Sequence, residues 1–188
     1  MHRRLPFVRP EPEVRQPQRD AGQRRRPDLT ETDGGGIDVR ELNDADLARI
    51  GDQLPLHRLR DAQTYLVAWD GSEPVGHAHL AWEETVLGVP ELGDVFVPAD
   101  LRGRGIGTEL SQAAEQMARG RGHRQISISA STANEGALRL YERLGYRDAG
   151  LPPRRVQGTI MVRTGPMEVN DTLVYLIKDI DDQVTLRV

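Results

Sequence analysis

The chain has 188 residues, of which 37% are apolar, and its formal net charge is −4 at pH 7. This length and apolar content suffice for one domain with its own core. Because there is no cysteine, disulfides, thiolate metal sites and cysteine nucleophiles are excluded. The mild negative charge argues against nucleic acid as the main partner, and no apolar run is long enough to span a membrane. We therefore expect a soluble, cytoplasmic protein with no membrane partner.

The N-terminal segment differs from the rest of the chain in its charge. Residues 1–26 are rich in arginine and proline and show no lasting apolar period. This composition predicts a disordered extension over residues 1–36, which ends in a run of glycine, ahead of a domain over residues 37–188. A basic arm for an anionic partner such as nucleic acid is one interpretation. A dispensable extension is favoured, because a run of charge is usually just solvated.

The domain is expected to begin with a strand and a helix. Residues 37–42 have the composition of a strand, and Asn43 is a good helix N-cap. Apolar residues at helical spacing continue to Leu54, and the proline that follows ends the pattern. Residues 56–60 suggest a second short helix.

A hairpin follows. Residues 64–69 and 74–83 are rich in β-formers, and the Asp70-Gly71 pair between them favours a tight turn. We expect these two strands to pair antiparallel. Residues 91–97 then form the next strand, after a second connection.

The strand over residues 91–97 leads into a glycine-rich turn and then a helix. The turn reads Arg-Gly-Arg-Gly-Ile-Gly over residues 102–107. Amides at a helix N-terminus have no intrahelical partner, and the helix dipole adds positive charge there, so this arrangement suits a phosphate. Glycine allows positive φ and the close approach of a bulky anion, and the two arginines add charge.

The spacing of this turn argues against two familiar nucleotide sites. A dinucleotide fingerprint requires G-x-G-x-x-G, which the turn does not contain. A P-loop requires lysine at its end, and Lys178 is the chain's one lysine.

The helix after the turn has a clear apolar face. Gly120 and Gly122 are expected to end this helix. That face is formed by Ile106, Leu110, Ala113 and Met117. Residues 126–130 alternate apolar residues with serine and predict a strand.

The C-terminal part is expected to hold one more helix and two strands. Residues 132–135 have the form of a capping box, so a helix is expected to start there. Strands are expected over residues 146–149 and 172–179, with a loop over residues 151–167. Strands interspersed with helices and hairpins predict an α/β (α+β) fold with a mixed, mostly antiparallel central sheet.

Two motifs resemble a known family. Arg102, Gly105 and Gly107, after Val97-Pro98, match Arg/Gln-x-x-Gly-x-Gly/Ala. The second motif is N-x-x-A-x-x-L-Y-x-x-x-G-F/Y, which the segment from Asn134 to Tyr146 matches. Together they resemble the GNAT superfamily of N-acetyltransferases, in which the first motif is the acetyl-CoA loop. The order of elements over residues 37–180 also resembles this fold.

The resemblance implies a cofactor site for acetyl-CoA. The backbone of Phe96 and Val97 would bind the pantetheine arm, and Asn134 would contact the pantetheine or a bound water. Tyr141 would place its hydroxyl near the thioester sulfur; the alternative is a core aromatic. The pyrophosphate would be held by the backbone amides of Arg102, Gly103, Arg104, Gly105, Ile106, Gly107 and Thr108.

The general base is open at this stage. Some family members hold a glutamate where Glu91 stands here, and water is the alternative proton relay.

Asp94 is three residues after Glu91, so strand pleating predicts that its side chain points to the opposite face of the sheet. Gly93 and Asp94 depart from the apolar or aromatic residues that the family often has here, which leaves the floor of the acceptor pocket undefined. His77 and His79 share a strand face, and a structural role is favoured over metal binding because no third ligand is evident.

The sequence thus implies an acetyl-CoA-dependent N-acetyltransferase that needs no metal and in which a primary amine attacks the thioester directly. The amine, on a small molecule or a protein, is unidentified, and its pocket is expected to involve residues 54–65 and 151–167. Two alternatives stay open: a non-catalytic acyl-CoA sensor on the same fold, and a nucleic-acid binder acting through residues 1–36. Whether the chain forms a homodimer is also open.

Overall fold

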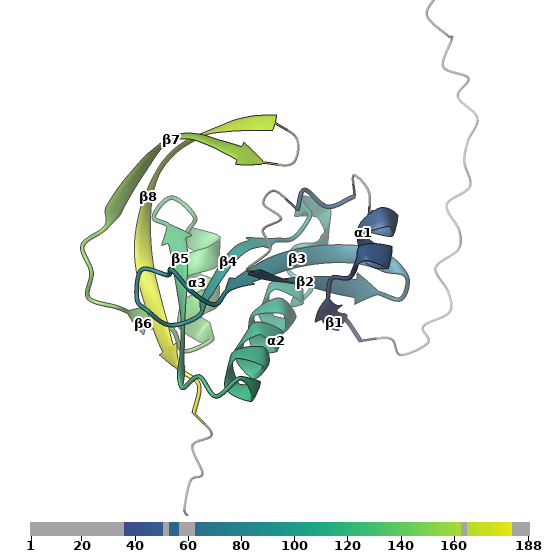
Figure 1. Cartoon of the computed structure of the whole chain (residues 1–188), viewed down its shortest axis with the longest axis horizontal. Helices are drawn as coiled ribbons and strands as arrows, with labels where there is room; N and C mark the ends of the chain where they lie inside the picture. Colours follow the sequence, from purple (N-terminus) through teal and green to yellow (C-terminus); the bar gives the residue numbers. More distant parts are fainter. Residues whose placement is uncertain (1–35, 51–52, 57–62, 163–164, 182–188) are drawn as a thin grey trace, which may run out of the picture. The chain divides into compact units, whose positions relative to one another are not determined.

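The structure, a computed structural model, describes residues 36–50, 53–56, 63–162 and 165–181 (Figure 1). All elements described below belong to one compact unit, Gly34–Val188. The expected N-terminal extension through residue 35, and all but the first residue of the expected helix over residues 56–60, lie outside the described residues. Within the described part of the chain, no helix is long and apolar enough to cross a bilayer.

The core of the unit is a mixed sheet with the order β1-β2-β3-β4-β5-β8-β6, and β7 pairs with β8 (Figure 1). Its strands are β1 (Asp38–Glu41), β2 (Gln63–Asp70), β3 (Glu73–Ala81), β4 (Glu91–Phe96), β5 (Gln125–Ser131), β6 (Arg147–Asp148), β7 (Arg154–Val162) and β8 (Gly165–Asp179). Every pairing in it is antiparallel except that of β4 with β5. The predicted fold class is confirmed.

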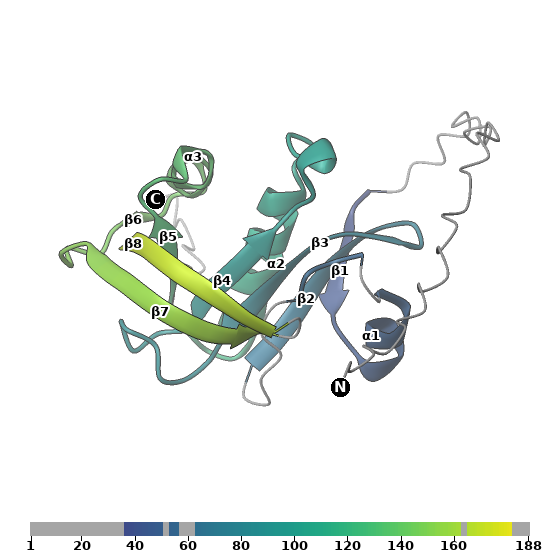
Figure 2. The same cartoon turned by 90° about the horizontal axis from the view of Figure 1, so that it is seen from above.

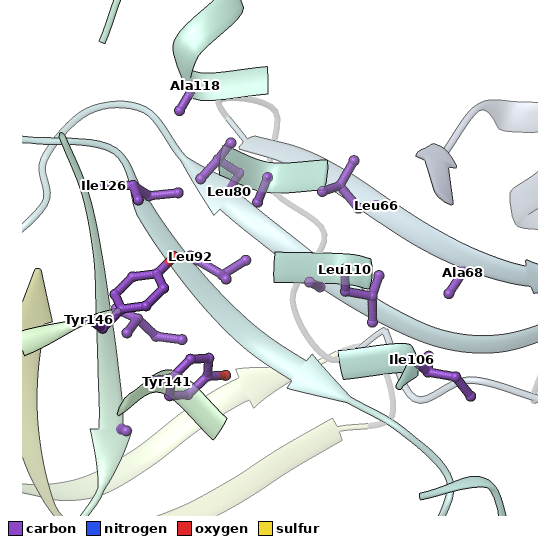
Figure 3. Close-up of a cluster of buried hydrophobic side chains, with 14 of the residues drawn as sticks. Leu66, Ala68, Leu80, Leu92, Ile106, Leu110, Ala118, Ile126, Tyr141 and Tyr146 are labelled. Carbon is purple, nitrogen blue, oxygen red and sulfur yellow. The ribbon is translucent and has the colours of Figure 1, made fainter. Parts of the chain in front are cut away.

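Helices α2 (Ile106–Gly120) and α3 (Glu135–Arg143) pack on one face of this sheet. The alternation in β5 explains which face: its apolar side chains join the core with α2, while its serines point to the other face. Figure 3 shows this core, whose buried members include Leu66, Leu80, Leu92, Ile106, Leu110, Ile126, Tyr141 and Tyr146. The predicted apolar face of α2 is confirmed, since Ile106 and Leu110 are buried in this core and Ala113 and Met117 pack against it.

The opposite face of the sheet is covered near β2 by α1 (Asp44–Ile50). A second cluster there contains Ile50, Leu54 and Trp69. Asn43 caps α1 as predicted, because its Oδ1 accepts a hydrogen bond from the backbone N–H of Asp46 at 2.9 Å.

Strand β4 contains a bulge that separates it from β5. His79 lies opposite Gly93, but His77 lies opposite Phe96, so β4 carries one residue more than β3 between these pairs. Asp94 adopts a φ of 45° at this point. The β4–β5 pairing consists of Glu91↔Ser127 and Leu92↔Ile128 in the described residues, and the two strands part beyond it. We call the opening between β4 and β5 beyond Leu92 and Ile128 the fork.

The predicted loop over residues 151–167 is wrong. Most of it forms β7, which pairs with β8 from Arg154↔Leu173 to Val162↔Gly165. Both views show β7 and β8 side by side as a curved ribbon (Figures 1 and 2). Most β7 side chains are exposed, so the strand has little of the apolar alternation that marks a half-buried strand. Backbone pairing with β8 maintains it instead.

The predicted start of α3 is also wrong, by a short shift. Its N-cap is Asn134, whose Oδ1 accepts a hydrogen bond from the Ala137 N–H at 3.1 Å, so the capping box over residues 132–135 does not form. Ser131 instead uses its hydroxyl to accept a bond from the Ala133 N–H at 3.1 Å, which turns the chain ahead of the helix.

The close packing of α2 on β3 depends on Gly76. A Cβ at Gly76 would lie 2.9 Å from the Phe96 carbonyl oxygen and 3.0 Å from an Ile106 methyl carbon. We predict that Gly76→Ala lowers the free energy of unfolding by about 1–3 kcal/mol, because the core must move to admit the methyl group. Urea denaturation measures this. Gly120→Ala is the control, since a methyl group at this helical residue would meet no atom within 4 Å. Equal stability of both variants would contradict the prediction.

Candidate active site

A pocket of about 520 Å³ opens where the end of β4, the N-terminus of α2 and α3 meet. Nearly all residues expected to bind the cofactor line it: Phe96, Val97, Arg102, Gly103, Gly105, Ile106, Gly107, Thr108 and Asn134. Tyr141 lines it as well. Two motifs separated by about thirty residues in the chain are thus brought to one pocket.

Arg104 is the exception among the expected cofactor residues. Its guanidinium Nη2 lies 2.7 Å from Oδ2 of Asp70, at the end of β2 next to the hairpin turn, and it is not part of the pocket lining. Arg143 does line the pocket, although the sequence reasoning did not single it out. It follows Leu140 by three residues, and this helical spacing places the two on one side of α3.

The turn before α2 has the features of an anion site. Gly103 and Gly105 have φ values of 81° and 85°, and a Cβ at either would meet no atom within 4 Å. Gly105 is the N-cap of α2 and brings no side chain to cap its first amides. Arg102 borders the turn, where its Nε donates a hydrogen bond to the Val97 carbonyl at 3.1 Å. An open, glycine-lined helix N-terminus beside arginine suits a phosphate group.

The side-chain oxygen and the side-chain nitrogen of Asn134 have different roles. Its Oδ1 accepts the capping bond from Ala137, so the side-chain oxygen is engaged in α3. The side-chain NH₂ group, which only donates, is the part of Asn134 that could face a ligand acceptor in the pocket.

Tyr141 is buried, with 3% of its surface exposed, and packs edge-on against Tyr146 at 5.6 Å between ring centroids. Figure 3 shows both rings beside Leu92, between β4, which carries Leu92, and β5, which carries Ile126. Burial raises the pKa of Tyr141 above its ordinary value, because the charged phenolate is poorly solvated there. The hydroxyl therefore stays protonated at neutral pH and can donate to a developing anion.

Glu91 lies at the base of the fork, on the face away from α2. Ser129 of β5 donates its hydroxyl hydrogen to Oε1 of Glu91 at 2.7 Å. Glu91 does not line the pocket that contains Tyr141. Its carboxylate therefore lies on the sheet face opposite the one that α2 covers.

Asp94 does not lie on the face that strand pleating predicts. The bulge adds a residue, and the Asp94 carboxylate comes within 3.2 Å of Nδ1 of His79. His79 itself lies over Gly93, since a Cβ at Gly93 would come within 2.7 Å of the imidazole. Residues opposite one another share a face, so His79, Gly93 and Asp94 form the sheet surface beside the fork. A polar pair thus stands where the sequence left the acceptor floor undefined.

Comparisons with known proteins agree with this geometry. Residues 36–146 match the model of the Acetyltransferase (GNAT) family. An uncharacterized N-acetyltransferase of Methanocaldococcus jannaschii is 34% identical over 93 residues, which are 47% of this chain and 41% of that protein. An L-methionine sulfoximine/L-methionine sulfone acetyltransferase of Pseudomonas aeruginosa is 33% identical over 101 residues, 52% of this chain and 58% of that protein. The chain spans about half the length of these curated relatives.

A solved structure supports the fold. A GNAT family acetyltransferase from Elizabethkingia anophelis, with acetyl-CoA bound, superposes with a TM-score of 0.57 at 18% identity. The match covers 76% of this chain and 97% of that one.

Tyr141 and Tyr146 should make folding stability depend on alkaline pH. Burial raises both pKa values, and the nearby Glu115 carboxylate adds to the rise at Tyr146. Unfolded tyrosine ionises near pH 10, so above about pH 10 the unfolded chain releases protons that the folded chain keeps. We predict that the free energy of unfolding falls as pH rises above about 10, and falls less in Tyr141→Phe and Tyr146→Phe. Urea denaturation over this range measures it, and an equal fall in the double variant would contradict it.

Proposed function

Because this chain belongs to the GNAT acetyltransferase family, we propose that it transfers the acetyl group of acetyl-CoA to a primary amine. The observation that supports this most is the single pocket that joins a glycine-lined helix N-terminus, the parted edge of β4 and the buried Tyr141. Acetyl-CoA would use all three features: the helix N-terminus for its pyrophosphate, the backbone edge for its pantetheine arm, and the phenol for its thioester sulfur.

The residues present fit acetyl-CoA. The amides of the turn from Arg102 to Thr108 would hold the pyrophosphate, with Arg102 as its charged neighbour. Phe96 and Val97 line the pocket beyond the point where β4 parts from β5, so their backbone would pair with the amide-containing pantetheine arm. Asn134 would donate from its side-chain NH₂ group. When bound, acetyl-CoA supplies the activated acyl group.

The acceptor would approach from the other face of the fork. That face carries the carboxylates of Glu91 and Asp94 at β4, and Asp171 on β8 accepts a hydrogen bond from the Ser131 hydroxyl at 2.8 Å. Negative charge there would attract the ammonium form of an amine. The nitrogen must lose a proton before it attacks the thioester carbonyl. Tyr141 would then protonate the departing thiolate.

Tyr141→Phe tests the role of the phenol. We expect the turnover number to fall by about 10²-fold or more, because general acid catalysis contributes on this order, while the dissociation constant for acetyl-CoA changes little. Tyr146→Phe is the matched control, since it removes a hydroxyl from a neighbouring buried tyrosine that does not line the pocket. Release of free CoA in the presence of an amine panel measures turnover. Equal rates for both variants would refute the role of Tyr141.

The same amine panel decides between an enzyme and a non-catalytic acyl-CoA sensor. An enzyme releases CoA with at least one amine and acetylates it. Tight binding of acetyl-CoA without turnover on any amine would favour the sensor and contradict the proposed function.

Two substitutions of Gly103 that differ only in charge test whether the turn binds the pyrophosphate. We predict that Gly103→Asp binds acetyl-CoA about tenfold more weakly than Gly103→Asn, because a carboxylate beside the pyrophosphate costs about 1.4 kcal/mol of binding free energy. Asn and Asp tolerate the positive φ of this position similarly, and the open space around Gly103 admits both. Isothermal titration calorimetry at low and high salt measures the difference, which should shrink as salt rises. Equal affinity of the two variants would place the pyrophosphate elsewhere.

A further inference from the structure

Building on the proposed transfer to an amine, we propose that His79 accepts the proton of the acceptor's ammonium group and that Asp94 positions it. His79 would be the catalytic base, and Asp94 would act through it.

The bulge in β4 brings the pair together. Nδ1 of His79 lies 3.2 Å from Oδ2 of Asp94, and Nδ1 is enclosed, whereas 12% of the His79 side chain remains exposed. The exposed part of the imidazole is therefore not the edge that faces Asp94. Nε2, on the other edge of the ring, is the atom to which we assign the transferred proton.

Gly93 gives His79 its place beside the fork. The imidazole occupies the space that any side chain at Gly93 would fill, because a Cβ there would stand only 2.7 Å from the ring. Gly93 is also the first β4 residue past the last pair with β5, Leu92↔Ile128. Val95, two residues further on, lines the proposed acetyl-CoA pocket. His79 thus lies opposite the β4 residue at which the fork begins, two residues ahead of the pocket lining at Val95.

The neighbouring groups support a proton acceptor at this point. Asp94 contacts His79 from β4, and Tyr65 faces it from β2 with 5.9 Å between ring centroids. Glu91 lies on the same sheet face, opposite Ala81. On β3 itself, His77 stands two residues away and stacks on Phe96. Glu91 already accepts a hydrogen bond from Ser129, and its negative charge suits it to holding the ammonium. The adjacent Asp94 carboxylate, at 3.2 Å, attracts the imidazolium that proton transfer creates.

His79, Tyr141 and solvent account for every proton that moves in the reaction. His79 Nε2 takes one proton from the ammonium, and the freed lone pair of the nitrogen forms the bond to the acyl carbon. The carbon–sulfur bond breaks, and the thiolate receives a proton from the Tyr141 hydroxyl. The nitrogen loses its second proton as the amide forms, which restores Tyr141. One proton is released overall, and His79 passes it to solvent.

His79→Gln tests the proposal with the full chain. We expect kcat/KM for the best amine of the panel to fall by about 10²-fold or more, and the acid limb of its pH profile to disappear. The dissociation constant for acetyl-CoA should stay the same, because His79 does not line the pocket. His123→Gln is the matched control: His123 stacks on Trp82, away from the fork, and the variant should keep the wild-type profile.

Asp94→Asn keeps the proposal testable if His79→Gln does not fold. Asparagine tolerates positive φ as well as aspartate does, so the bulge is retained. We expect kcat for the amine to fall by about tenfold while its KM and the dissociation constant for acetyl-CoA change little, because His79 loses the carboxylate that positions it. Wild-type kcat in Asp94→Asn, or wild-type kcat/KM in a folded His79→Gln, would overturn the proposal.

Glu91→Gln separates the two candidate bases. A higher KM for the amine with the acid limb retained supports charge attraction by Glu91 and proton transfer to His79. Loss of the limb in Glu91→Gln, with the limb kept in His79→Gln, would make Glu91 the base and would leave the proposed acetyl transfer intact. Failure of the wild-type chain to acetylate any amine would overturn both proposals.

Discussion

One extra residue in β4 is the constraint on which the candidate site depends. Parallel strands that remain paired share their backbone hydrogen bonds and leave no room between them. The bulge at Asp94 bends β4 away after Leu92, and the β4–β5 pairing ends there. The positive φ of Asp94 costs on the order of 1 kcal/mol. The fork and the free backbone edge beyond it follow from this local strain.

The helices around the fork supply the N-terminal amides and the side chains that line the pocket. Helix α2 begins where β4 ends, so its N-terminus and the glycines before it face the opening. Helix α3 adds Asn134 and Tyr141 from the other side, and close packing on Tyr146 keeps the Tyr141 ring in place. On the opposite face, Glu91 and the His79–Asp94 pair stand at the base of the same opening. In the proposed function, this one break in strand pairing separates the donor side from the acceptor side.

Much of this arrangement could be predicted from the sequence, because its signals are local. Helix periodicity from Ile106, serine alternation in β5 and the glycine-rich turn each reflect the geometry of a few consecutive residues. The bulge could not be predicted, because it is a relation between β3 and β4; pleating alone placed Asp94 on the wrong face. The ion pair between Arg104 and Asp70 could not be predicted either, because the two residues are 34 positions apart in the chain. Strand β7 was missed because its exposed residues carry no burial pattern, and β8 supplies its hydrogen bonds.

The most direct test of the donor site is a crystal structure of the chain with acetyl-CoA bound. We predict that the pyrophosphate lies on the amides of the turn from Arg102 to Thr108 and that the pantetheine arm follows β4 at Phe96 and Val97. The thioester should lie in the fork, with its sulfur beside the Tyr141 hydroxyl. Acetyl-CoA bound outside this pocket, or β4 and β5 paired through to Phe96 in the complex, would contradict the proposed site.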